Sequence, residues 1–573
     1  MALLLYNSYI VLERDGLMTK AEIIGKAKGL PSYVKDHWNT PNEGEFVSLK
    51  EFCAYTATQA GSYIFLTASG MLSFSASYFC GSIMGLSNMQ FQLVNLISTI
   101  IGYLFMFMNP ISVLIYENHG ELSPKMRRFA HICYSGEMVI GLLCYFMPMD
   151  TFDFMLGTPQ IIANILFLSG ITNYITWGIR KKFCAKYGRL KPFILLCGIP
   201  AAIIMSIIPF LPIQNLPSVY KLIILHGAFI MMNYFYGAYV GVNGLVTFMT
   251  PNSQERQRLH SIVPIITGLF PSVIGLFFPM LIQSTGGYLN INTYKIFVPI
   301  FGFIGVFVSM AAIHCHERVI EASGDKRKKV TFFNGAKNVL KNKYLWITNI
   351  SNILGQWSGL VGGLLQFWFI YSLRMEALYG VAANVVVVGM TFGNILCPIL
   401  TKKFQKKNIL IAFRGISLLT VFLMLFAVRI ENIYVFIGAM FLRNTFQPVV
   451  DGINIGLGAD IQDYHQWKYG ERADSMAGVF GWFLNPINVV LGFIIPGLLA
   501  KVGFTSDWDV LFDQAILNSV FNIYTWATII STVLMVIPFF FYDLTREKHD
   551  MCVAELQERL RAIENEETES EVV

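Results

Sequence analysis

Long apolar runs separated by short polar segments are the main pattern of this chain. Residues 52–116 contain no Asp, Glu, Lys, Arg or His, and residues 261–294 are equally free of these side chains. About 20 apolar residues suffice for a helix to cross a bilayer, and a charged side chain is costly in hydrocarbon. The runs therefore predict membrane-spanning α-helices, which pair their backbone polar groups internally.

Charged residues, Gly and Pro divide these runs into about fourteen candidate spans, which predicts an all-α polytopic membrane protein. The candidate spans are 52–80, 90–116, 129–149, 159–180, 191–213, 220–248, 261–284, 295–315, 345–372, 379–401, 408–428, 432–459, 475–500 and 519–542. After the last span, apolar residues recur at helical spacing among charged ones, so the tail predicts an amphipathic surface helix.

Basic residues are concentrated in alternate loops between the candidate spans. Clusters at 125–128, 180–191 and 402–407 contrast with the intervening loops, which hold few Lys and Arg. Because basic loops stay on the cytoplasmic side, this asymmetry predicts an even number of spans with both termini in the cytoplasm. The predicted division is a lead-in at 1–50, an N-terminal helical bundle at 51–316, a basic linker at 317–344, a C-terminal bundle at 345–543 and a cytoplasmic tail at 544–573.

Composition supports a membrane protein and argues against several other classes. The chain has 573 residues, of which 54% are hydrophobic and 14% charged, whereas roughly a quarter of the residues are charged in soluble proteins. The net charge of +6 arises from loop residues, so it does not indicate a nucleic-acid partner. The nine Cys residues show no paired spacing that would indicate a disulfide framework or a zinc site, and no cofactor or metal is expected.

A dense polar block at 459–474, ADIQDYHQWKYGERAD, lies between two long apolar runs. Its charge predicts that one helix leaves the bilayer here and the next re-enters. Two further inward loops carry motifs, AKYGRLKPF at 185–193 and SQERQRL at 253–259. In order and spacing, the three segments resemble the glycoside-pentoside-hexuronide:cation symporter family of the major facilitator superfamily. The resemblance implies a two-bundle fold that rocks around a central site, with 12 core transmembrane helices and an extra pair in the N-terminal half.

The three motif loops predict a cytoplasmic gate. Gly188 permits a tight turn between two helices. Acidic and basic side chains of the loops are expected to pair when the inner ends of the bundles meet, and such pairs would bias the inward-open against the inward-closed state. The predicted gate residues are Gly188, Arg189, Arg256, Asp460, Asp463, Lys468 and Arg472, with Asp474 as a further acid. The alternative is that these charges set the topology and contact lipid headgroups.

The resemblance also implies that the family's usual pocket charges are absent. The aligned positions hold neutral residues: Ser169 and Asn173 for two cation-binding aspartates, Tyr239 for a sugar-binding aspartate, Asn243 for its neighbouring tryptophan, and Asn485 beside the position of a pocket lysine. An alternative alignment of the cation site uses Met108–Pro110 and also has Asn in place of Asp. An asparagine can bind Na⁺ through its carbonyl oxygen but cannot carry a proton. A different solute, a different coupling mode, or both are therefore expected.

A polar stripe in the span at 432–459 offers a replacement for these charges. Arg443, Gln447 and Asp451 recur at every fourth residue, so they share one helix face. Arg443 lies about eleven residues from the outer end of the span, which is near mid-bilayer. Ionisable residues inside a membrane usually serve function, so the three are candidate solute-binding residues and Asp451 is a candidate coupling acid. The alternative is a structural Arg443–Asp451 pair that positions the helix.

Two further residues complete the predicted site. Glu137, in the third candidate span, is a second candidate coupling acid. Trp482 is a candidate for stacking on a sugar ring, with packing or lipid contact as its alternative.

Together these features predict a secondary active transporter that moves a small hydrophilic solute by alternating access. A sugar, glycoside or uronide is the expected solute, and coupling to Na⁺ or H⁺ is left open. The transporter is expected to be a monomer in the plasma or inner membrane, with the solute and the lipid bilayer as its partners. The alternatives are a carrier of lysolipids or other amphiphiles and a non-transporting sensor on a carrier frame. A membrane enzyme is disfavoured because the only paired acids, Asp460 and Asp463, lie in a transporter-like motif.

Overall fold

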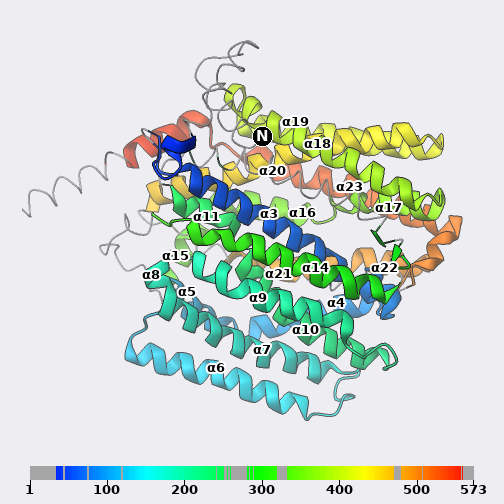
Figure 1. Cartoon of the computed structure of the whole chain (residues 1–573), viewed down its shortest axis with the longest axis horizontal. Helices are drawn as coiled ribbons and strands as arrows, with labels where there is room; N and C mark the ends of the chain where they lie inside the picture. The colour runs from blue at the N-terminus through cyan, green and yellow to red at the C-terminus, as the bar shows by residue number, and fades with distance from the viewer. Residues whose placement is uncertain are drawn as a thin grey trace, which may run out of the picture. The chain divides into compact units, whose positions relative to one another are not determined.

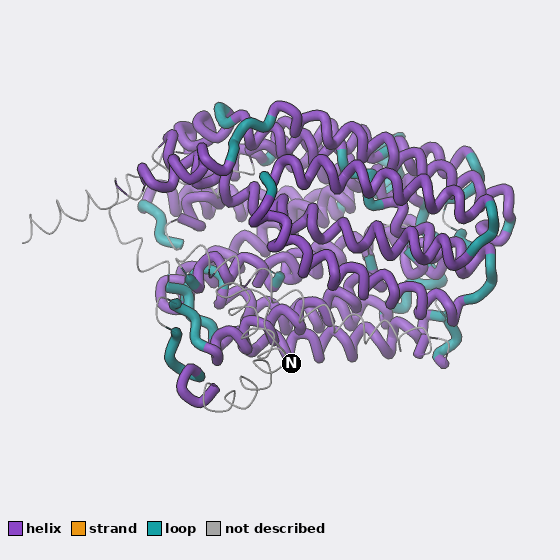
Figure 2. Tube along the Cα trace, turned by 90° about the horizontal axis from the view of Figure 1, so that it is seen from above, coloured by secondary structure: helices purple, strands orange, loops and turns teal. Residues whose placement is uncertain are grey.

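The computed structural model describes residues 34–42, 45–73, 77–117, 120–240, 242–250, 255, 259, 281–282, 284–287, 290–318, 332–469, 479–505, 507–556 and 558. This part of the chain is helical and contains no β-strand (Figure 2). The predicted gate residues Arg256 and Arg472, together with Asp474 and most of the predicted span at 261–284, lie outside the described residues.

The chain divides into two compact units. Unit 1 consists of Met1–Ser87 and Leu114–Lys326, and unit 2 consists of Asn88–Val113 and Arg327–Val573. The boundary at 326 falls inside the predicted linker, whereas Asn88–Val113, expected in the N-terminal bundle, groups with the helices of the C-terminal half. The reason is packing: α4 (Asn88–Leu104) lies against α21 (Val479–Gly492) and α22 (Ile494–Lys501). The side chains of α4 therefore belong to unit 2.

Unit 1 is built from six long described helices. They are α3 (Leu49–Leu72), α6 (Pro124–Tyr145), α7 (Thr158–Ile179), α9 (Lys191–Ile207), α10 (Ser218–Tyr239) and α14 (Ile291–Ser309). Shorter elements are η1 (Tyr78–Ile83), η3 (Arg180–Cys184), α8 (Ala185–Tyr187), η4 (Ile208–Phe210), α11 (Val242–Met249) and η5 (Met310–His314). Helix α6 packs on α7, α7 on α10, α10 on α9, α9 on α14 and α14 on α3 (Figure 1).

Glycines allow α3 and α14 of unit 1 to cross closely. A methyl group added to Gly61 of α3 would overlap Gly305 and Ser309 of α14. Small residues let helix backbones approach closely in a membrane, where van der Waals packing rather than hydrophobic burial holds helices together. Helix α3 begins at a capping box, in which the side chains of Ser48 and Glu51 pair with each other's backbone N–H groups.

Unit 2 surrounds a very long helix, α20 (Ile433–Tyr469), which packs on α18 (Glu376–Lys403) and α19 (Lys406–Arg429). Its other elements are η2 (Met106–Met108), α15 (Phe332–Leu340), α16 (Lys343–Leu354), η7 (Leu360–Gly363), α17 (Leu364–Phe367), η8 (Trp368–Ser372), η10 (Asp509–Phe512), α23 (Gln514–Val536) and η11 (Ile537–Phe541), and α5 (Asn109–Glu117) continues from it into unit 1. Residues 546–556 of the predicted tail helix are helical. At about 1.5 Å per residue, the 37 residues of α20 extend about 55 Å, which exceeds the hydrocarbon thickness of a bilayer.

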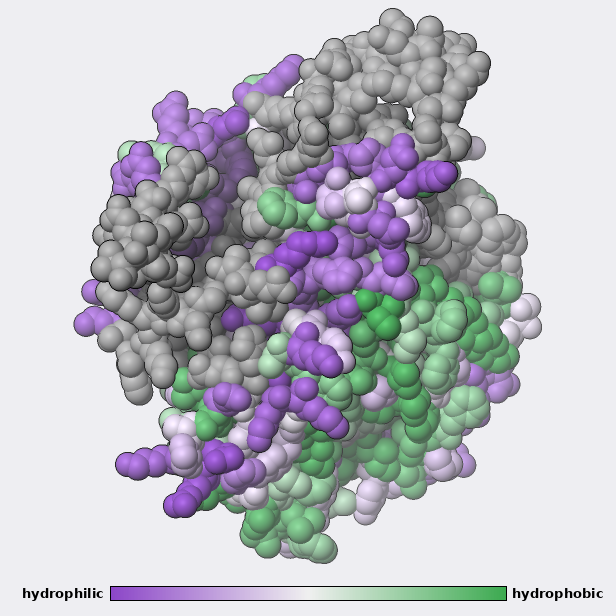
Figure 3. Space-filling model, turned by 60° about the vertical axis from the view of Figure 1, so that its left-hand side comes forward, coloured by the Kyte–Doolittle hydropathy of each residue, from purple (hydrophilic) through white to green (hydrophobic). Residues whose placement is uncertain are grey.

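The described helices fit a protein that crosses the membrane many times. Eight of them are long and apolar enough to span, or nine if the bent pair Asn88–Leu104 and Met106–Tyr116 counts as one span. The face drawn in Figure 3 carries a broad apolar area, as expected for helix flanks that contact lipid. Among the described residues the count stays below the predicted fourteen, in part because predicted spans are interrupted. The one at 345–372 consists of α16 and a second helical run, separated by turn residues 355–359.

Candidate solute site

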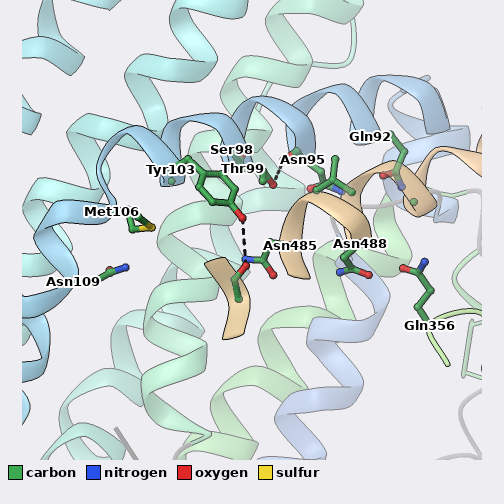
Figure 4. A pocket seen from close by; sticks show the side chains of 14 residues that line it. Gln92, Asn95, Ser98, Thr99, Tyr103, Met106, Asn109, Gln356, Asn485 and Asn488 are labelled. Atoms are coloured by element: carbon green, nitrogen blue, oxygen red, sulfur yellow. Dashed lines mark hydrogen bonds between the residues drawn. The ribbon is translucent and has the colours of Figure 1, made fainter. Parts of the chain in front are cut away.

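A polar cavity of about 640 Å³ lies within unit 2. It is bordered by α4, by the first residues of η2 and α5, by α21 and by one residue of the break after α16 (Figure 4). Among the described residues that line it, none is charged. Those with an amide or hydroxyl group are Gln92, Asn95, Ser98, Thr99, Tyr103, Asn109, Gln356, Asn485 and Asn488. Of the substrate-binding residues predicted from the sequence, Asn485 lies in this lining.

The α4 wall of the cavity is a polar stripe on an otherwise apolar helix. Gln92, Asn95, Thr99 and Tyr103 follow each other at intervals of three or four residues, so they share one face. On other faces, Ile100 is half exposed, which suits contact with lipid. Sequence reasoning missed this stripe because the span carries no charge. The helical spacing of its amide and hydroxyl groups is the signal that would have found it.

The α21 wall is held against α4 by a hydrogen bond and by small residues. The Tyr103 hydroxyl donates to the backbone carbonyl of Gly481 over 3.4 Å (Figure 4). A Cβ atom at Gly492 would lie 3.0 Å from Gln92 Oε1, whereas one at Gly102 would meet nothing within 4 Å. Gly492 thus lets the two helices approach each other, while Gly102 faces open space in the cavity.

Arg443, predicted as a solute ligand, binds the backbone of the break after α16. Its Nη2 donates to the carbonyl oxygen of Ser358 over 2.7 Å, and the side chain is 9% exposed. Gln356, two residues earlier, lines the cavity, and its Nε2 is buried. The structure therefore gives Arg443 a carbonyl partner in place of the alternative pair with Asp451.

Asp451 and Gln447 form a second network with a residue that sequence reasoning missed. Arg414 of α19 is 6% exposed, and its Nη1 donates to Gln447 Oε1 over 3.5 Å. Gln447 Nε2 in turn donates to Asp451 Oδ1 over 2.9 Å. The glutamine amide therefore bridges a buried cation and an acid. Arg414 could have been suspected from its place inside an apolar span.

In unit 1, Glu137 meets one of the positions predicted for cation binding. Glu137 of α6 is 4% exposed, and Asn173 Nδ2 of α7 donates to its Oε2 over 3.3 Å. The same amide lies 3.4 Å from Ser169 Oγ. The neighbouring helix thus supplies a carboxylate beside the two neutral residues, Ser169 and Asn173, that align with the family's cation-binding aspartates.

Of three other predicted pocket residues, the structure describes the side chain of one. Tyr239 is fully buried in unit 1, where its hydroxyl group is hydrogen-bonded to Ser309 and to the carbonyl oxygen of Gly305. It ties α10 to α14. Asn243 and Trp482 lie on α11 and α21, and their side chains are outside the described part of the chain.

The predicted gate loop at 185–193 is anchored by an acid that sequence reasoning did not single out. Gly188 has a φ of +104°, a conformation that favours glycine. Glu317 accepts hydrogen bonds from the backbone N–H groups of Arg189, Leu190 and Lys191 at 2.7, 2.9 and 2.7 Å. A carboxylate at the N-terminus of α9 is favoured by the unpaired N–H groups and by the helix dipole.

Two acids of the 459–474 block, Asp460 and Asp463, are paired within unit 2. Lys406 Nζ lies 2.8 and 2.6 Å from the two carboxylate oxygens of Asp460. His549, in the tail helix, places Nε2 at 3.3 Å from Asp463 and 3.7 Å from Asp460. The hydrogen bond with Asp463 and the charges of both acids raise the pKa of His549 above its ordinary value. Lys468 is exposed and lies over the ring of Tyr464, and pairing of these acids with arginines of the other gate loops stays a prediction.

Comparison with known proteins now adds to these observations. The sequence profile of a family described as MFS/sugar transport protein matches residues 153–546. The chain belongs to this family. It is therefore a multi-pass membrane transporter of the major facilitator superfamily and not an enzyme, and the resemblance found in its loop motifs is confirmed.

Three relatives show the range of this transporter's similarities. It is 25% identical to the uncharacterized symporter YjmB of Bacillus subtilis over 418 residues, which cover 70% of this chain and 88% of the relative. A putative sulfoquinovose importer of Escherichia coli is 23% identical, with 77% and 96% covered. The isoprimeverose transporter of Lactiplantibacillus pentosus is 21% identical, with 78% and 94% covered.

Proposed function

We propose that this transporter moves an uncharged sugar or glycoside by alternating access and that the cavity of unit 2 is part of its solute site. The observation that carries the proposal is the cavity lining, which is rich in amide and hydroxyl groups and in its described part has no charged side chain. Amide groups both donate and accept hydrogen bonds, so they suit the hydroxyl groups of a sugar. The volume of about 640 Å³ is within the range of small-molecule sites.

The same lining argues against other solute classes. A uronide or a sulfonated sugar carries a negative charge, and proteins usually bind such groups with Arg or Lys. A lysolipid needs a largely apolar wall for its acyl chain, whereas Met106 and Val489 are the main apolar side chains here. The relatives' names include both a sulfoquinovose importer and an isoprimeverose transporter, and the uncharged lining favours a solute of the second kind.

Coupling to Na⁺ or H⁺ is proposed to use a carboxylate inside the membrane. Glu137 is buried beside Asn173, and a buried ionised carboxylate without a cation is strongly disfavoured. Binding of a proton or of Na⁺ would relieve this cost. Asp451, linked to Arg414 through Gln447, is the second candidate.

The finer topology also belongs to this proposal. It comprises 12 core spans and an extra pair in the N-terminal half, with both termini in the cytoplasm. The transporter would be a monomer in the plasma or inner membrane of the cell. The loops at 185–193, 253–259 and 459–474 would form the cytoplasmic gate. The basic loops on alternate sides of the candidate spans support this arrangement.

Solute counterflow into proteoliposomes tests the proposed function. Vesicles with purified transporter are expected to exchange glucose, isoprimeverose or raffinose, and not sulfoquinovose or glucuronate. Asn488→Leu should reduce this exchange about tenfold, as expected for the loss of one or two hydrogen bonds. Asn444→Leu is the matched control, because the Asn444 amide bonds to Met440 of its own helix and does not line the cavity. Exchange of the anionic sugars alone would refute the proposal, and binding without exchange would favour a sensor.

A further inference from the structure

The break between α16 and η7 forms a rigid part of the cavity wall. Helix α16 ends at Leu354, residues 355–359 form turns, and the chain becomes helical again at Leu360. A non-helical segment at membrane depth is tolerated where other protein groups or a cavity satisfy its backbone. Here two neighbouring helices supply these groups.

Two hydroxyl side chains of α23 form hydrogen bonds with the backbone of the break. The backbone N–H of Trp357 donates to Ser531 Oγ over 3.2 Å, and that hydroxyl donates to the carbonyl oxygen of Leu354 over 2.6 Å. Thr528 Oγ1 donates to the carbonyl oxygen of Trp357 over 3.3 Å. Two hydroxyl side chains therefore replace hydrogen bonds that a continuous helix would make within its own backbone.

Arg443 of α20 ties the break at its far end, through the 2.7 Å bond to the Ser358 carbonyl oxygen. A guanidinium group supplies a charged donor to this carbonyl, which lies between the two helical runs. Hydrogen bonds from a charged donor are also stronger than neutral ones. Arg443 is 9% exposed and does not line the cavity, so it acts on the segment and not on a solute.

Gln356 lies between these anchored groups and faces the cavity (Figure 4). Its Nε2 is buried and, among the described residues, has no hydrogen-bond partner. A buried amide N–H without a partner is unfavourable, and rotation of the Gln356 side chain into the cavity would let a hydroxyl, ring or glycosidic oxygen of a sugar satisfy it. Asn488, on the α21 wall, also lines the cavity.

We infer that Gln356 is a specificity-determining residue of the solute cavity and that Arg443 is its positioning residue. This inference rests on the proposed function for its solute, an uncharged sugar. A site built to hydrogen-bond an oxygen rejects an analogue that lacks it, because the protein group is then left unpaired. Gln356 therefore selects for solutes with an oxygen at its amide, and Arg443 keeps that amide in place by fixing the segment two residues away.

The positioning role can be tested without knowing the solute. Gln356→Cys is labelled in membranes with a small polar methanethiosulfonate reagent, and the modified fraction is measured by mass spectrometry on the tryptic peptide between Lys343 and Arg374, which contains no native Cys. We expect labelling in the Gln356→Cys chain. Adding Arg443→Met should change its rate about tenfold, as expected from losing one charged hydrogen bond, and Arg443→Lys should restore much of the original rate.

Asn485→Cys, on the α21 wall, provides the matched control. Its peptide, between Arg472 and Lys501, also contains no native Cys, and its labelling rate should not change with Arg443→Met. A loss of folding would alter both positions, so only a selective change at 356 supports the inference. Equal labelling of Gln356→Cys with and without Arg443 would overturn it.

The specificity role is tested by exchange of glucose against its monodeoxy analogues. Gln356→Leu should reduce glucose exchange about tenfold and leave at least one deoxyglucose unaffected, whereas the intact chain should discriminate against that analogue. An unchanged discrimination ratio would overturn the inference while leaving the proposed function intact. If no sugar is exchanged and no sugar slows labelling at position 356, the proposed function and the specificity role of Gln356 both fail. A labelling rate that depends on Arg443 would still establish the positioning role of Arg443.

Discussion

The tail helix is expected to dock on α20 in a pH-dependent way through His549. The imidazole Nε2 lies 3.3 Å from Asp463 and 3.7 Å from Asp460, and on its own helix Nδ1 is 3.8 Å from Asp550, while the positive charge of Lys406 disfavours protonation of the imidazole. His549 and Asp463 are 19% and 33% exposed, so solvent weakens the pair only in part. His549→Ala should therefore weaken docking by about 1–2 kcal/mol, which corresponds to about a 5- to 30-fold change in the docking equilibrium.

The sign of the pH dependence follows from the raised pKa of His549. Its stabilising effect is fully present below the ordinary histidine pKa of about 6.5 and is lost as the pH rises through the higher pKa of the docked state. The contribution of His549 should therefore be largest near pH 6 and should disappear in alkaline solution.

Cys552 provides the assay, because it is fully buried between the tail helix and the rest of unit 2. Its maleimide labelling, measured by mass spectrometry on the tryptic peptide that starts at residue 549, requires transient undocking. The labelling rate of His549→Ala relative to the unaltered chain should be about 5- to 30-fold at pH 6 and fall toward one at high pH, since the effect of pH on the thiol itself cancels in this ratio. Arg546→Ala is the control, because Arg546 is exposed and pairs with Asp550 of its own turn. A ratio near one at pH 6, or a ratio independent of pH, would refute the role assigned to His549.

Three further predictions concern packing, the gate loop and coupling. Gly393→Ala should destabilise the protein by about 1–3 kcal/mol and lower its melting temperature, because the added methyl group would overlap the carbonyl of Thr445. Gly102→Ala should leave the melting temperature unchanged in the same thermal unfolding assay. Gly102→Leu should reduce glucose counterflow, because the larger side chain would fill part of the cavity. Glu317→Gln should destabilise unit 1 by about 1–3 kcal/mol, because three backbone N–H groups lose a charged acceptor, and slower proteolysis at the 185–193 loop than in the unaltered chain would contradict this. Asp451→Asn should abolish the dependence of uptake on an ion gradient if Asp451 is the coupling acid, and unchanged gradient dependence would leave Glu137 as the candidate.

The membrane helices could be predicted from the sequence because apolar length and charge-free runs report directly on the bilayer. The span at 432–459 and the polar segment after it were also predicted from this pattern, but α20 continues as a helix through this segment to Tyr469. Helix breaks were harder to foresee: the break at 355–359 depends on hydroxyl groups of Thr528 and Ser531, which are more than 170 residues away in the chain. No local signal reports such partners.

The candidate site was predicted only in part, for a related reason. Charge drew attention to Arg443, but its partner is a backbone carbonyl 85 residues earlier, and carbonyls have no sequence signature. The polar stripe of α4 was overlooked because amides and hydroxyls in an uncharged span stand out less than ionisable groups. Asn485 was reached through the family resemblance, while its neighbour Asn488 and the buried Arg414 became apparent from their contacts in the structure.

The absence of charge among the described residues of the cavity lining has an electrical consequence. If the solute is neutral, every elementary charge that crosses the membrane during uptake belongs to a coupling ion, so the ratio of current to solute flux counts the ions directly. At a membrane potential of 100 mV, negative inside, one cation per solute supplies about 2.3 kcal/mol, enough for about a fiftyfold accumulation of the sugar. Currents recorded on solid-supported membranes together with the sugar flux would therefore give the number of ions transported per sugar. Sugar uptake without any current would identify a facilitator that only equilibrates its solute.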